Sequence, residues 1–159
     1  MKKINKVKTL YCSLVIIDIV FAILLLLQVV ILVIPDLIHQ DFDEERVFGA
    51  FHYLVIVFQG SLLLLGFWRI QQALRNIIRL GSYNDLTERK IRKGGMLIIS
   101  FGIVSFLINL LKISEMELDT FVHHLILSVF TSLVGLSLLI LSDFVKNGMV
   151  LKEDVDLTI

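Results

Sequence analysis

The sequence is poor in the residues that mark disulfide-stabilised proteins and enzymes. Its 159 residues include one proline and one cysteine, Cys12, so no intrachain disulfide can form. The motifs HExxH and GxSxG and a glycine-rich phosphate loop do not occur in it. We therefore predict a protein that is not an enzyme and that uses no cofactor.

Apolar side chains, in contrast, are in excess. Hydrophobic residues make up 57% of the chain, and the mean hydropathy is +0.87. Soluble domains are roughly 45–50% apolar. The formal net charge is zero, but the charges are sorted into basic and acidic blocks along the chain. This composition predicts one integral membrane domain, residues 1–159.

Four apolar stretches predict membrane spans, because about 20 residues of helix cross a hydrocarbon core of roughly 30 Å. We place these spans at about residues 10–34, 48–67, 94–111 and 121–141. Pro35 is expected to end the first one. No A-x-A cleavage site follows the lysines that precede this span, so we expect it to be retained. The predicted fold class is an all-α integral membrane four-helix bundle.

The longest polar interruption, residues 68–93, separates the second and third spans. Helical amphipathicity in this segment predicts that the second helix continues beyond the membrane and stops at Gly81. Asp85 and Glu88 predict the N-cap of the next helix. The segment is therefore expected to form a cytoplasmic helical hairpin. Its basic residues are Arg69, Arg75, Arg79, Arg89, Lys90, Arg92 and Lys93.

The distribution of Lys and Arg predicts the orientation. Four precede the first span, seven lie in residues 68–93 and two in the tail, residues 142–159, against only Arg46 and Lys112 in the other loops. Because Lys and Arg are retained on the cytoplasmic side, we expect both termini and the hairpin to be cytoplasmic, in a multi-pass protein of the inner membrane. The hairpin is expected to contact anionic lipid rather than nucleic acid.

Small and polar residues recur in the spans at helical spacing. They predict packing seams between helices, and a substrate pathway is the alternative. The residues are His52, Gln59 and Gly66 in the second span, Gly95, Gly102, Ser105 and Asn109 in the third, and His124, Ser128, Ser132 and Gly135 in the fourth.

Asp18 is the one acidic residue inside an apolar run, and burying its charge costs several kcal/mol. We expect a structural ion pair with Arg69 or Lys8 at the same level. A proton relay or an ion-binding role is the alternative.

The histidines and the acidic loops fall at the opposite, outer end of the chain. Imidazole and carboxylate groups can bind a transition metal or sense pH. No ligand spacing supports a metal site, because His123 and His124 are adjacent and expected to point apart. The histidines are His39, His52, His123 and His124.

Two stretches resemble a known family. Residues 73–99, ALRNIIRLGSYNDLTERKIRKGGMLII, and residues 144–159, FVKNGMVLKEDVDLTI, are similar to the central and closing segments of the bacterial membrane proteins catalogued as domain of unknown function 2975. The resemblance implies a four-span fold over essentially the whole chain. It assigns no activity, but the family's genes often accompany small helix-turn-helix regulators, which implies such a partner. The matching residues are Gly81, Tyr83, Arg92, Gly95, Phe144, Gly148, Leu151, Asp156, Leu157, Thr158 and Ile159.

We expect a non-catalytic regulatory or stress-response protein of the bacterial inner membrane that acts on a soluble partner through its hairpin and tail. The tail is expected to leave the helix at Gly148 and to fold back onto the hairpin, and a homo-oligomer is left open. The alternatives are an immunity protein against membrane-active peptides and a small transporter that uses Asp18. Candidate functional residues are Asp18, His52, Gln59, His124, Arg79, Arg92, Asp156 and Thr158.

Overall fold

The computed structural model describes residues 2–33, 44–80, 84–111 and 117–157, and all regular structure in them is helical. The elements are α1 (Lys2–Gln28), the π-helical turn η1 (Val29–Val33), α3 (Glu44–Leu80), α4 (Asp85–Leu111) and α5 (Leu118–Leu157). Pro35, the predicted end of the first span, lies outside the described residues. Four of these helices are long and apolar enough to cross a membrane. The all-α fold class is therefore confirmed.

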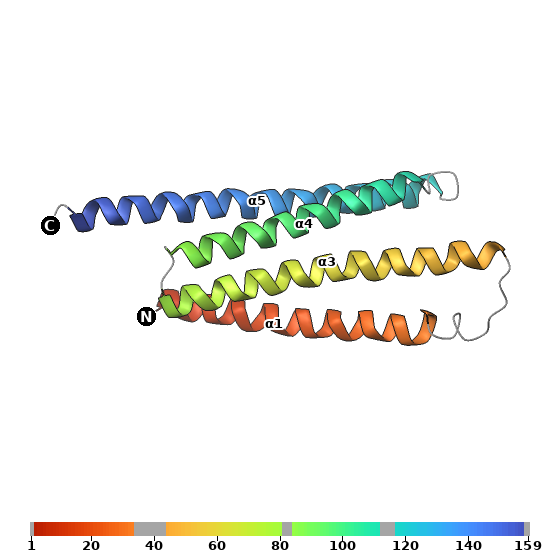
Figure 1. Ribbon diagram of the computed structural model, residues 1–159, viewed down its shortest axis with the longest axis horizontal. Helices are drawn as coiled ribbons and strands as arrows, with labels where there is room; N and C mark the ends of the chain where they lie inside the picture. Colours follow the sequence, from red (N-terminus) through yellow and green to blue (C-terminus); the bar gives the residue numbers. More distant parts are fainter. Residues whose placement is uncertain (1, 34–43, 81–83, 112–116, 158–159) are drawn as a thin grey trace.

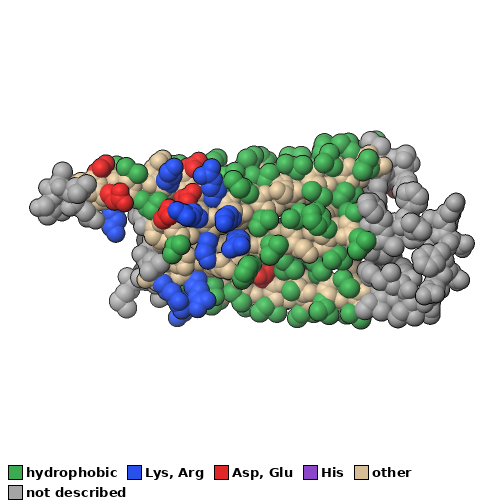
Figure 2. All heavy atoms as spheres, in the orientation of Figure 1, with side chains coloured by type: hydrophobic (Ala, Val, Ile, Leu, Met, Phe, Trp, Pro, Cys, Tyr) green, Lys and Arg blue, Asp and Glu red, His purple; other side chains and the backbone are tan. Residues whose placement is uncertain are grey.

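The helices lie side by side in the order of the chain (Figure 1). Helix α1 packs against α3, α3 against α4, and α4 against α5, and the α4–α5 interface is the most extensive. Among the described residues, this order leaves α1 and α5 as the two edges of an open row. The start of α1, the end of α3, the start of α4 and the end of α5 share one end of the molecule (Figure 1). Figure 2 shows Lys and Arg side chains gathered in a band there, and we call it the basic end.

Two helices are much longer than a membrane core requires. Helix α3 has 37 residues and α5 has 40, which at about 1.5 Å per residue gives lengths of about 55 and 60 Å against a core of roughly 30 Å. Helix α3 ends at Leu80, directly before the predicted stop at Gly81, and α4 begins at Asp85. The expected extension of both helices beyond the apolar stretches is therefore present.

The predicted helix stop at Gly148 is wrong. Helix α5 runs through Gly148 to Leu157, so the tail does not turn back; it runs straight past the start of α4, where Glu153 lines the same cleft as Arg92 (Figure 1). A glycine inside a helix costs about 1 kcal/mol relative to alanine. Here Val145, three residues earlier, is buried with Ile91 and Ala73, and Met149, directly after Gly148, lines a cleft with residues of α4, so the contacts with α4 continue across the glycine.

Helix α4 is the central element because glycines let two neighbours approach it closely. A Cβ atom built at Gly94 would lie 3.2 Å from the carbonyl oxygen of Gly66 in α3, and one built at Gly95 would lie 2.9 Å from that of Gly135 in α5. One built at Gly102 would lie 2.9 Å from the carbonyl oxygen of Ser128. The prediction that small residues form packing seams between helices is therefore confirmed at these glycines.

Helix α1 is held far less firmly. No side chain between residues 6 and 31 is buried, and Leu26 is 64% exposed. At Gly60 of α3, a methyl group would overlap the side chain of Leu25 in α1. Such an apolar, exposed helix suits a lipid environment better than water.

Candidate functional site

A cleft opens at the basic end, where the first turns of α4 lie against the extension of α5. We call it the interfacial cleft, and its volume is about 380 Å³. Charged side chains of both signs line it together with two apolar ones. The lining residues are Asp85, Glu88 and Arg92 of α4 and Lys146, Met149, Val150 and Glu153 of α5.

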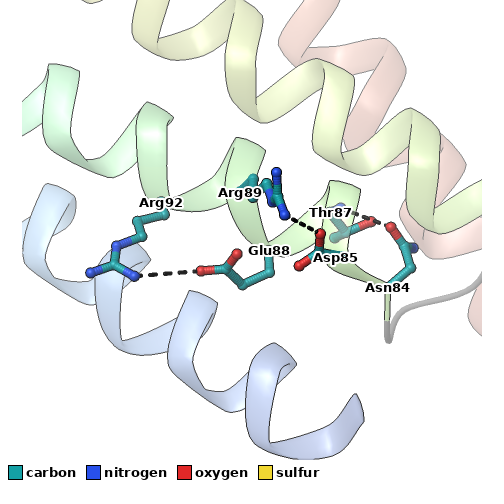
Figure 3. A network of polar contacts seen from close by, with 6 residues as sticks. All are labelled: Asn84, Asp85, Thr87, Glu88, Arg89 and Arg92. Carbon is teal, nitrogen blue, oxygen red and sulfur yellow. Dashed lines mark hydrogen bonds and ion pairs between the residues drawn. The ribbon is translucent and has the colours of Figure 1, made fainter.

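The α4 side of the cleft is set by a helix cap (Figure 3). The side-chain oxygen of Asn84 accepts a hydrogen bond from the backbone N–H of Thr87 at 2.8 Å, as a good N-cap residue does. Asn84 is therefore the cap, and the prediction of Asp85 in that role is wrong. Asp85 lies one residue inside the helix and forms an ion pair with Arg89 at 2.7 Å. The signal that could have found the cap is an Asn placed directly before the helical pattern begins.

Glu88 is the buried charge of the cleft. Its side chain is 8% exposed, and one of its oxygens lies 3.8 Å from a guanidinium nitrogen of Arg92 (Figure 3). This distance gives electrostatic attraction but is too long for a hydrogen bond. Lys146 and Glu153 line the same cleft from α5. Because a buried carboxylate is costly unless it is paired, a ligand or partner that offers Glu88 a donor would gain a charge-assisted hydrogen bond.

A second polar cluster joins α1 to α3 around Asp18. The side-chain amide of Gln71 donates to Asp18 Oδ2 at 2.8 Å and to the backbone carbonyl of Leu14 at 3.2 Å. The expected ion pair of Asp18 with Arg69 or Lys8 is therefore wrong. Arg69 and Gln71 are two residues apart, which places them on nearly opposite sides of α3, and it is Gln71 that faces α1. Asp18 Oδ1 is buried without a hydrogen-bond partner in the described part of the chain.

Gln59 lies deeper in the spans and serves packing. Its amide donates to the hydroxyl of Ser105 at 3.1 Å and so links α3 to α4. A cleft of about 250 Å³ beside it is lined mainly by apolar side chains, with Gln28 as the other polar one. Asp18 is not among its lining residues, so the polar residues considered for a substrate pathway are not joined in that cleft.

The described histidines do not form a metal site. The backbone carbonyl of His124 accepts a hydrogen bond from Ser128 at 2.8 Å. Its ring lies edge-on to that of His123 with centroids 6.1 Å apart, so the prediction that the two point apart is wrong. His39 and the side chain of His52 lie outside the described residues. Within the part that is described, no group of three or more His, Cys, Asp or Glu could hold a metal ion.

The remaining candidates belong to the basic end. Arg79 is exposed in the last turn of α3, where the helix dipole favours a cation. Arg92 borders the interfacial cleft. The side chain of Asp156 and the whole of Thr158 lie outside the described residues. The structure thus brings Arg92 together with Glu88, Lys146 and Glu153, three residues that were not predicted as site residues.

No family model, curated protein or solved structure matches the chain. The resemblance of residues 73–99 and 144–159 to the family of unknown function 2975 stays a prediction. The interfacial cleft and the projecting end of α5 are the features at the basic end from which a function can be inferred.

Proposed function

We propose that the chain is a non-catalytic, multi-pass protein of the bacterial inner membrane that regulates a soluble protein docking at its basic end. The observation that carries this proposal is the interfacial cleft. It combines a buried carboxylate, bordering cations and two apolar side chains, Met149 and Val150. Such a mixture is typical of surfaces that bind another protein with defined polarity.

The orientation in this proposal follows from the band of Lys and Arg at the basic end (Figure 2). Positive residues are retained in the cytoplasm, so the band would lie at the inner surface of the membrane. The exposed side chains of Arg75, Arg89 and Lys93 would then meet anionic headgroups. The interfacial cleft, which extends past Arg92 toward Asp85, would open to the cytoplasm.

The partner that best fits the cleft is a protein surface with both a basic and an acidic side chain. A basic group would reach Glu88 and Glu153, and an acidic group would reach Lys146 and Arg92. A small helix-turn-helix regulator, the partner implied by the family resemblance, can present such a surface on one helix. Because both walls of the cleft are helices packed on each other, binding would require little rearrangement of this chain.

The test compares the same charge reversal on two sides of α5. A photoreactive residue at Met149, inside the cleft, is expected to crosslink one soluble protein in intact cells. Lys146→Glu, which changes the cleft, is expected to abolish that adduct and to reproduce the transcript changes of a deletion strain. Lys152→Glu does not touch the cleft and is expected to leave both unchanged. Adducts with lipid alone, or equal effects of the two reversals, would contradict the proposal.

A small transporter is the second candidate, favoured by the buried oxygen Asp18 Oδ1. An intramembrane carboxylate with an unfilled acceptor can take a proton or a cation. If this candidate is correct, Asp18→Asn will keep the fold and abolish ion flux in proteoliposomes. Flux that is absent from the wild-type protein would exclude it.

A further inference from the structure

Helix α5 carries an apolar stripe along nearly its whole length, on positions that alternate by three and four residues. Seven of the nine positions hold large apolar side chains, and their exposed fractions run from 40% at Val134 to 66% at Phe144 and Leu151. The two others are Ser137 and Gly148. The stripe consists of Leu127, Phe130, Val134, Ser137, Leu141, Phe144, Gly148, Leu151 and Val155.

The stripe stays apolar where α5 runs beside the charged first turns of α4. Inside the span lipid can cover any side of α5, since residues on other sides, such as Ile126 and Leu133, are exposed and apolar as well. Met149 and Glu153 line the same cleft as Asp85 and Glu88, so Leu151, which is 66% exposed, lies beside the charged first turns of α4. With these charges at the membrane surface, as proposed above, lipid tails would not cover Leu151.

The sides of α5 around this part of the stripe are polar. Asn147 and Asp154 follow one flank and Lys152 the other. At 3.6 residues per turn, the cleft-lining residues of α5 lie on the side of the helix opposite the stripe. An occupant of the stripe would therefore leave the interfacial cleft open, and the two surfaces can act independently.

We propose that a second copy of this chain covers the stripe, with the two α5 helices parallel and related by a twofold axis along the membrane normal. The occupant must be apolar both within the membrane and beyond it. A second α5, inserted in the same orientation, presents a stripe of the same length at the same depth. Lipid would cover only the part of the stripe inside the membrane, and a soluble protein only the part beyond it.

The spacing and the flanking charges fit this pairing. Alternation by three and four over four heptads is the pattern of a parallel two-stranded coiled coil. In such a pair the flank with Lys152 faces the partner's flank with Asn147 and Asp154, so Lys152 meets no like charge from these residues. Ser137 is small, which lets the two helices approach closely.

Two adjacent apolar residues provide a matched test, because Leu151 is in the stripe and Val150, 53% exposed, is in the cleft. In a Cys12→Ser background, Leu151→Cys and Phe144→Cys are expected to form disulfide-linked dimers when native membranes are oxidised with copper phenanthroline. Val150→Cys is expected to stay monomeric. Equal dimer yields at positions 150 and 151, or none at 144 and 151, would overturn the proposal. A disulfide from position 151 to a different protein would do the same.

A measurement without crosslinks uses charge instead. Single-molecule photobleaching in sparse liposomes is expected to show wild-type dimers and a dissociation constant raised about ten-fold or more by Leu151→Lys, since one buried apolar side chain is lost from each copy. Val150→Lys is expected to change it less than about two-fold, because an exposed surface change is small. Wild-type protein that is monomeric at every density, or equal effects of the two variants, would overturn the pairing.

Discussion

The contact of Gly135 with α4 makes a strong prediction about stability. A Cβ atom at this position would lie 2.6 Å from the Ile99 side chain and 2.9 Å from two backbone atoms, the carbonyl oxygen of Gly95 and the amide nitrogen of Ile99. Ordinary contacts of a Cβ atom begin at 3.4 Å. Side chains can turn away, but these backbone atoms move only if α4 and α5 separate. Gly135→Ala should therefore open the most extensive interface of the molecule.

Two opposing terms set the magnitude. Forcing an extra methyl group into a packed interface costs about 1–3 kcal/mol, and replacing glycine by alanine in a helix interior gains about 1 kcal/mol. Gly148→Ala, in the same helix and half-buried, should show the gain without the cost. The difference between the two variants cancels the helix propensity. We expect Gly135→Ala to be less stable than Gly148→Ala by about 1–3 kcal/mol.

The assay is unfolding by SDS in mixed micelles, followed by the fluorescence of Trp68, the single tryptophan. Gly135→Ala should lower the SDS midpoint, and Gly148→Ala should leave it unchanged or raise it. Gly135→Val should lower it further because its side chain is larger. Equal midpoints for the two alanine variants would show that the α4 and α5 backbones are not in direct contact.

Three further variants address other contacts. Gln71→Leu should lower the free energy of unfolding by about 1–3 kcal/mol, because Asp18 loses its hydrogen-bond donor. In a double-mutant cycle, adding Asp18→Leu should change this free energy little further. Fully additive effects of the two substitutions would contradict the contact. Asn84→Ala should cost about 1 kcal/mol and speed amide exchange at the start of α4, whereas Asn84→Ser should not. Gly60→Leu should push α1 away from α3 at Leu25 and broaden the spin-label distances between them; an unchanged distribution would refute the close approach.

Much of the helical architecture could be predicted from apolar runs alone. Their lengths predict four helices long enough to cross a membrane, and the unbroken amphipathic pattern after the second run predicts the extension of α3 to Leu80. The glycines of the α4–α5 seam were also found, because Gly95 and Gly102 repeat at the spacing of two helical turns and small residues mark close approach in membranes.

The errors came from properties that local sequence does not carry. Gly148 has the intrinsic tendency to end a helix, but contacts of α5 with α4 on both sides of it, at Val145 and Met149, outweigh this tendency. The partner of Asp18 depends on how α3 is rotated about its axis, and a charge count favoured Arg69 over the neutral Gln71. The interfacial cleft could not be predicted because it depends on how far α4 and α5 are shifted along each other. That shift is set by contacts between residues far apart in the chain.

The four helices are packed with unequal tightness, so one side of the row should be more rigid than the other. The backbones of helices α4 and α5 are in close contact at Gly95, Gly102 and Gly135. We therefore expect these two helices to move together as one rigid unit. Helix α1 buries no described side chain between residues 6 and 31 and is fastened to α3 at Gly60 and Gln71. The work needed to displace a helix is therefore smallest for α1, so a force applied across the row would move α1 first, while the two walls of the interfacial cleft keep their spacing.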